Sequence, residues 1–166
     1  MYTLQDKESI QLPDQYTAVY YPYKVSEWAV EYKPLPFMKK RKEKMRVISN
    51  LFHKETGLFE WPVDKMEALS TKVEDVFLPE QYEESDRHYT SLDFIRNLYL
   101  HKRKVWSNPV IDCLNTYSLY VTYAIFPEIQ KGRKVYQMVE LATGQKVNLH
   151  HHKKIYQYLQ SKEVIT

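Results

Sequence analysis

Glycine is scarce in this chain, and that scarcity restricts the folds and sites that it can form. Only three glycines occur among 166 residues, Gly57, Gly132 and Gly144, and they lie far apart. Phosphate-binding loops and nucleophile elbows need glycines at short fixed spacings, because the backbone must approach a ligand closely or adopt a positive φ. No such spacing is present, so P-loop, dinucleotide-binding Rossmann and α/β-hydrolase sites are excluded.

Length and composition indicate one globular domain over residues 1–166. Hydrophobic residues make up 43% and charged residues 27% of the chain, as in proteins with an ordinary packed core. The single cysteine, Cys113, excludes an internal disulfide and favours a reducing compartment. The N-terminus does not resemble a signal peptide, and residues 109–126 are too polar for a membrane span. We therefore predict a cytoplasmic protein without membrane contact.

Alternating polar and apolar residues predict strands near both ends of the chain. In residues 26–33, Trp28, Val30 and Tyr32 point to one side of a strand. The other predicted strands are rich in aromatic and β-branched side chains, and they cover residues 17–23 (expected to pair with the first strand), 117–126, 134–141 and 145–149.

Helices are expected between these strands and at the C-terminus. Met38, Met45 and Ile48 are spaced like one face of a helix over residues 37–54, and Gly57 is expected to end it. The other helices are predicted after Pro62, from Thr90 and Ser91 onward, and over residues 151–162. The inner side of the first is expected to hold Val63, Met66, Leu69, Val73, Val76 and Phe77, and the apolar stripe of the second Leu92, Ile95, Tyr99 and Trp106. The predicted fold class is thus α+β, a single domain with antiparallel strands near both ends and three to four helices between them and at the C-terminus.

Charge is divided into blocks of alternating sign, although the net charge is only +3. Residues 37–54 hold seven basic and one acidic residue, residues 55–93 three basic and eleven acidic, and residues 94–166 eleven basic and four acidic. A basic run is often just the solvated face of a helix, balanced by an acidic neighbour such as residues 74–86. Clustered lysine and arginine also bind phosphates, and aromatic rings stack on exposed bases.

The candidate nucleic-acid contacts are the basic clusters and the aromatic residues beside them. They are Lys39, Lys40, Arg41, Lys42, Lys44, Arg46, Lys102, Arg103, Lys104 and Trp106, with Tyr99 nearby.

These clusters predict a non-enzymatic nucleic-acid-associated protein, an accessory or regulatory factor of a phage or mobile element. A low-GC host is expected because lysine and tyrosine, which AT-rich codons favour, are abundant while glycine is scarce. The alternative is a protein-interaction module, an inhibitor or adaptor that docks on a host protein through a charged surface rich in tyrosine. Either protein could form a homo-oligomer.

A metal-dependent hydrolase is a weaker alternative that rests on His150, His151 and His152. On a strand, His150 and His152 would share a face and could bind one metal ion. A third ligand at fixed spacing is missing, and the acidic residues 74–86 lack a metal-binding spacing. A solvated histidine patch is the ordinary explanation, so we expect no metal or other cofactor and assign no catalytic residue.

Overall fold

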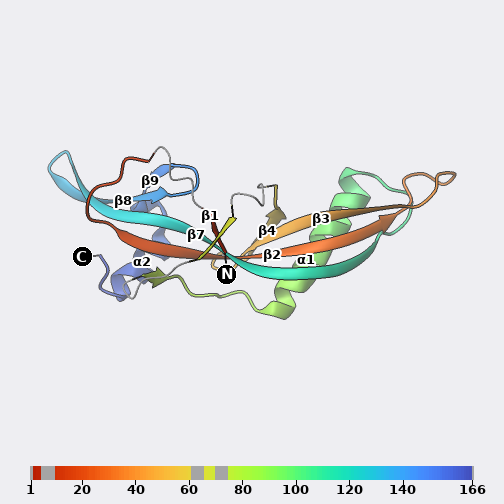
Figure 1. The fold of residues 1–166 in the computed structure, drawn as a ribbon, viewed down its shortest axis with the longest axis horizontal. Helices are drawn as coiled ribbons and strands as arrows, with labels where there is room; N and C mark the ends of the chain where they lie inside the picture. The colour runs from red at the N-terminus through yellow and green to blue at the C-terminus, as the bar shows by residue number, and fades with distance from the viewer. Residues whose placement is uncertain (1, 5–9, 61–65, 70–74, 166) are drawn as a thin grey trace. The chain divides into compact units, whose positions relative to one another are not determined.

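The computed structural model describes residues 2–4, 10–60, 66–69 and 75–165, and strands dominate its regular structure. Pairing joins nine strands in the order β4-β3-β2-β7-β1-β5, with β6 beside β2, β8 beside β7 and β9 beside β8 (Figure 1). The strands are β1 (Tyr2–Leu4), β2 (Thr17–Tyr32), β3 (Arg41–Asn50), β4 (Glu55–Leu58), β5 (Met66–Ala68), β6 (Val76–Phe77), β7 (Val110–Gln130), β8 (Arg133–Glu140) and β9 (Lys146–Asn148). The helices are α1 (Glu84–Asn97), the π-helical η2 (Leu98–Lys102), the 3-10 helix η3 (Leu149–His151) and α2 (Lys153–Ser161).

The predicted fold class is wrong, because sheet replaces much of the expected helix. Within the described ranges only α1 and α2 are α-helices, where three to four are predicted. The sheet is also mixed: β1 runs parallel to β7 and β6 runs parallel to β2, whereas the sequence predicts antiparallel strands. Strands do form at β7, β8 and β9, where aromatic and β-branched residues predict them.

The chain divides into two compact units, and each is built from segments far apart in the sequence. Unit 1 contains Met1–Pro22, Pro62–Pro79 and Leu119–Thr166, and unit 2 contains Tyr23–Trp61 and Glu80–Ser118. The strands β2 and β7 each contribute to both units. A single domain over residues 1–166 stays a prediction.

In unit 2, β2 follows the alternation that the sequence predicts. Trp28 and Val30 are 1% and 0% exposed, and they form a core with Val47, Ile95 and Tyr99. Burial of such side chains is the main favourable contribution to folding, at about 1.5–3 kcal/mol for each. The helix α1 supplies part of this core and lies along one face of the strands of unit 2 (Figure 1).

The predicted pairing between residues 17–23 and 26–33 is wrong, because both stretches belong to the single strand β2. The neighbour of β2 changes near Pro22: β6 pairs before it, and β3 pairs from Tyr23 onward. Proline has no N–H to donate to a neighbouring strand. The neighbour of β2 can therefore change at Pro22 without loss of a backbone hydrogen bond from this residue.

The helix predicted over residues 37–54 is wrong, because β3 occupies most of this stretch. Lys42, Lys44 and Arg46 alternate with residues such as Met45, which packs against the core beneath α1. Side chains two residues apart share one face of a strand, so the basic residues line the side of β3 that faces away from α1. Lysine, arginine and methionine are good helix formers, and pairing with β2 overrides that local preference.

Two further helix predictions fail for similar reasons. Gly57 lies inside β4 and does not end a helix. After Pro62, the described residues form the short strands β5 and β6. The remaining residues of that predicted helix, including Val63 and Val73, lie outside the described ranges.

The helix predicted from Thr90 and Ser91 is confirmed as α1, but it begins at Glu84 with Glu83 as its N-cap residue. Acidic side chains in its first turn interact favourably with the positive end of the helix dipole. The predicted inward position of Ile95 is confirmed, since it is fully buried. Trp106, predicted on the same stripe, lies beyond the helical residues.

In unit 1, the C-terminal helix is confirmed as α2, and it buries Ile155 and Leu159. The hydroxyl of Tyr158, on the same helix, donates a hydrogen bond to the carbonyl oxygen of Phe77 at 3.1 Å. The Phe77 ring stacks on Tyr20, with the ring centroids 4.7 Å apart. Much of the tyrosine in this unit is therefore core material and does not form a surface.

Candidate nucleic-acid interface

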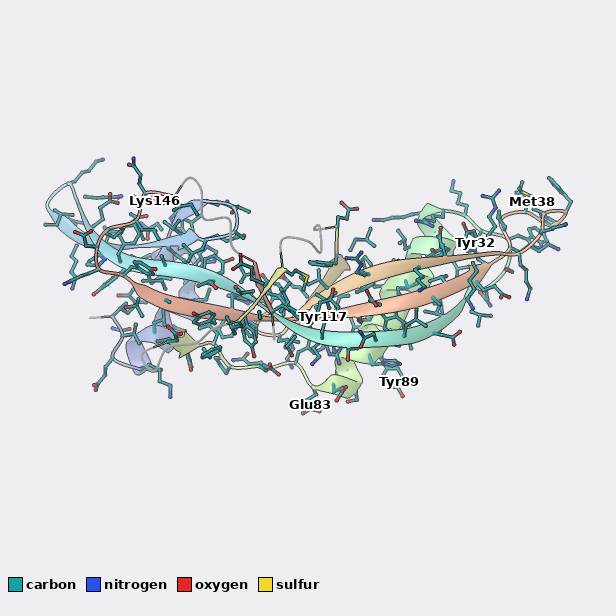
Figure 2. The ribbon with its side chains drawn as sticks, viewed as in Figure 1. Tyr32, Met38, Glu83, Tyr89, Tyr117 and Lys146 are labelled. Carbon is teal, nitrogen blue, oxygen red and sulfur yellow. The ribbon has the colours of Figure 1, made fainter. Side chains whose placement is uncertain are left out.

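The loop between β2 and β3 brings exposed apolar side chains to one end of unit 2. This proline-rich loop, residues 33–40, contains a turn in which the amide of Met38 donates to the carbonyl oxygen of Leu35 at 3.1 Å. Leu35 is 45% exposed and Phe37 is 84% exposed. Figure 2 shows Met38 at the far end of the loop, beyond Tyr32.

The segment that follows η2 lies against the base of the same loop. The amide of Trp106 donates to the carbonyl oxygen of Lys33 at 2.9 Å, and the hydroxyl of Ser107 accepts from the amide of Lys33 at 3.0 Å. These bonds fix the backbone, while the indole of Trp106 stays 66% exposed. Two exposed aromatic side chains, Phe37 and Trp106, therefore belong to the same end of unit 2.

Basic residues flank these aromatic side chains in the sequence. Residues 32–42 contain five lysine and arginine residues and residues 98–111 contain three, and neither stretch contains aspartate or glutamate. We call this group the cationic end, and it consists of Lys33, Lys39, Lys40, Arg41, Lys42, Lys102, Arg103 and Lys104. Such an accumulation of one sign of charge attracts anionic partners.

Two of the predicted contacts are paired with carboxylates of β2. The ammonium of Lys40 lies 2.8 Å from a carboxylate oxygen of Glu31, and its hydrogen bond and charge lower the pKa of that carboxyl. The Nε of Arg46 lies 3.8 Å from a carboxylate oxygen of Glu27. All four side chains are at least one third exposed, and exposed pairs of this kind are weak.

Arg103 belongs to a cluster that the sequence does not reveal. It pairs with the Glu43 carboxylate, and its guanidinium lies 4.7 Å above the ring of Tyr99. The Tyr99 hydroxyl donates to Glu43. Burial raises the pKa of Tyr99, and the hydrogen bond to Glu43 raises it further. Tyr99 is predicted near the nucleic acid but is 0% exposed, so it supports Arg103 and offers no surface.

The remaining predicted basic contacts are exposed and have no carboxylate within ion-pair distance among the residues that the structure describes. They are Lys39, Arg41, Lys42, Lys44, Lys102 and Lys104. All of these except Lys44 belong to the cationic end as defined above. Lys44 and Arg46 lie farther along β3, where β2 presents Ala29 and Glu27 opposite them.

The acidic residues at the start of α1 lie away from the cationic end. Glu84 and Asp86 occupy the first turn of α1, and Lys102 ends η2, which directly continues α1. A rise of 1.5 Å per residue separates the two ends by roughly 25 Å, and Figure 2 shows Glu83 at the far end of α1 from Met38. The helix dipole favours acidic residues at the start of α1 and basic residues at the end of η2. The distance between the two ends prevents these acids from neutralising the cationic end.

The histidine run does not form the strand arrangement that a shared metal ion would need. β9 ends at Asn148, and His150 and His151 belong to η3. The ring of His150 lies 4.4 Å from that of Tyr156, between centroids. Among the described residues, no three histidine, cysteine, aspartate or glutamate side chains are grouped to hold a metal ion.

Sequence reasoning missed Phe37, although a signal for it exists. The segment from Pro34 to Lys40 alternates prolines with large apolar residues before two lysines, and prolines in a loop oppose both helix and central strand. An apolar residue held in such a loop has little chance of reaching the core.

Comparison with known proteins gives no match: no protein family, curated protein or solved structure is significantly similar to this chain. Within the described residues, none of the helices is long and apolar enough to cross a membrane.

Proposed function

We propose that the cationic end of unit 2 binds nucleic acid through its phosphates, and that the protein is a non-enzymatic accessory or regulatory factor. Origin from a phage or mobile element of a low-GC host, and a cytoplasmic location favoured by the single cysteine, belong to the same proposal. The observation that carries it is the set of exposed basic side chains that no carboxylate pairs with in the described part of the chain.

Basic side chains without an ion pair favour phosphate binding because few carboxylates compete for them. Among them Lys42 lies opposite Glu31 in the sheet, and its charge contributes to lowering the pKa of that carboxyl. Each lysine or arginine that neutralises a phosphate releases counterions, which makes the affinity fall with salt. The five unpaired basic residues of the cationic end would give a slope of log affinity against log salt of about −3.5 for single strands and about −4.5 for duplexes. They are Lys39, Arg41, Lys42, Lys102 and Lys104. Arg103 is excluded from this count because Glu43 already binds it.

The test compares two charge-reversal variants with the same change in net charge. Lys39→Glu with Lys102→Glu removes two exposed cations from the cationic end, and Lys153→Glu with Lys154→Glu removes two exposed cations from α2. We expect the first variant to bind labelled oligonucleotides more weakly and its salt slope to shrink by about two. The α2 variant is expected to bind like the unaltered protein, because its lysines lie outside the proposed interface.

Two results would contradict the proposal. The unaltered protein could fail to bind DNA or RNA of any form at low salt, or both variants could lose affinity equally. Circular dichroism of each variant must first show an unchanged fold, which we expect because all four side chains are exposed.

Docking on a partner protein is the second candidate, and the exposed apolar side chains of Leu35 and Phe37 favour it. The tyrosine-rich surface on which the alternative was first based is small in the described residues, where Tyr89 is the most exposed tyrosine at 68%. A protein partner captured through Phe37 would remain bound at moderate salt and after nuclease treatment, whereas a nucleic-acid complex would not.

A further inference from the structure

The cationic end carries exposed aromatic side chains, which phosphate binding alone does not require. Phe37 is the most exposed of the large hydrophobic side chains described, at 84%, and Trp106 is 66% exposed. Leaving such rings in water is unfavourable, and neither contributes to the core of unit 2. Their surroundings are cationic, with Lys39 and Lys40 following Phe37 and Lys102 and Lys104 preceding Trp106.

Both rings are presented by backbone that is held in place. The turn that carries Phe37 is closed by the hydrogen bond from Met38 to Leu35, and the amide of Trp106 is bound by the carbonyl of Lys33. A fixed backbone lowers the entropy that a ring loses when it binds a flat partner. Duplex DNA keeps the faces of its bases inside the stack, whereas single strands expose them to aromatic side chains.

We propose that the cationic end selects single-stranded nucleic acid, with Phe37 and Trp106 stacking on unpaired bases while the neighbouring lysines bind phosphates. The inference rests on the proposed function, and it adds the form of nucleic acid that is bound. A linear polyanion fits better than a lipid surface, because Lys42 and Lys44 extend the basic residues along β3 away from the tip of the loop. A flat bilayer would contact the tip alone.

The experiment measures binding of an oligothymidylate, which has no base pairing, and of a duplex of equal length. We expect tighter binding of the oligothymidylate and quenching of the tryptophan fluorescence as it binds. The quenching should be lost in Trp106→Ala, although Trp28 and Trp61 remain in that variant. Phe37→Leu keeps an apolar side chain but removes the ring, and Trp106→Ala removes the indole. Each should weaken oligothymidylate binding by about fivefold to 100-fold and leave duplex binding nearly unchanged.

Matched variants separate stacking from general apolar contact. Trp106→Tyr retains a ring and should retain most of the oligothymidylate affinity, and Phe37→Tyr should do the same. Equal binding of Phe37→Leu and the unaltered protein would overturn the inference, because leucine can replace phenylalanine in an apolar contact but not in a stack. A preference for the duplex would also overturn it.

The controls distinguish this failure from failure of the proposed function. If phosphate binding is correct but stacking is wrong, both nucleic acids bind with a steep salt dependence and the aromatic variants change nothing. If neither nucleic acid binds at low salt, the proposed function itself fails. Binding to phosphatidylglycerol vesicles, weakened by Trp106→Ala while oligothymidylate does not bind, would assign the same side chains to a lipid surface and overturn both proposals.

Discussion

Removing one hydroxyl, in Tyr99→Phe, should destabilise the protein measurably while preserving its core. The phenylalanine ring still fills the position among Trp28 and Ile95 and still lies beneath the Arg103 guanidinium. The change deletes the hydrogen bond to Glu43 and the one that Arg103 donates at 3.2 Å. A hydrogen bond to a charged group contributes about 1.5–3 kcal/mol.

The expected loss lies at or below the lower end of that range. The Glu43 side chain is 37% exposed and keeps its pairing with Arg103, so water and the guanidinium compensate part of the missing bond. We expect a loss of about 1–2 kcal/mol and a fall in Tm of about 2–8 °C. Tyr99→Ala also removes the buried ring and should cost about 3–5 kcal/mol.

Urea unfolding followed by circular dichroism measures both variants, with Tm by calorimetry as a second readout. The reasoning requires that the alanine variant lose at least about 1 kcal/mol more free energy of unfolding than the phenylalanine variant. Equal losses would show that the hydroxyl, and not the ring, holds η2 against β3. No loss in Tyr99→Phe would refute the claim that the link to Glu43 stabilises this unit.

Three further predictions concern positions away from the cationic end. Burial, and next the charge of Asp75, raises the pKa of Tyr20 to about 12. The folded state therefore holds this proton more tightly than the unfolded state, so stability to urea should be lost as pH rises from about 10 to 12. The loss should be smaller in Tyr20→Phe. Desolvation raises the pKa of the Cys113 thiol, so mass spectrometry should show slower alkylation by iodoacetamide at mildly alkaline pH in the folded than in the urea-unfolded protein. Gly144 has a φ of +72°, so Gly144→Ala should cost about 1–2 kcal/mol in urea unfolding, whereas Gly57→Ala, in open space within β4, should cost nothing or stabilise.

Local alternation predicts strands well where one face is uniformly apolar. Trp28, Val30 and Tyr32 satisfy that condition, and β2 forms around them. The inner face of β3 does not, because Glu43 lies among its inward residues. Its partners there are Tyr99 and Arg103, which follow 56 and 60 residues later in the chain. The strand β3 can therefore be recognised in the sequence only when the tertiary contacts of Glu43 are known.

In the candidate interface too, some features can be predicted from the local sequence, whereas others depend on contacts between distant segments. The basic residues are evident from sequence, and Lys40, Arg41 and Lys44 are exposed in the structure. The sequence does not show which of them are already paired, since the partner Glu27 of Arg46 depends on the register between β2 and β3. Nor does it show that Trp106 and the loop of Phe37 meet, because a backbone bond to Lys33 brings them together.

The interleaved order of the two units sets an order in which they can be completed during synthesis. The last segment of unit 2 ends at Ser118, whereas unit 1 still requires β8, β9 and α2. Domains fold as their residues leave the ribosome, so all residues of the cationic end emerge before unit 1 can close. Until β8 is made, the unit 1 part of β7 lacks its hairpin partner, and an unpaired strand edge of this kind invites aggregation. A pause in translation just after Gln130, when β7 is complete and β8 has not been made, would therefore be more hazardous to this protein than a pause after Glu140.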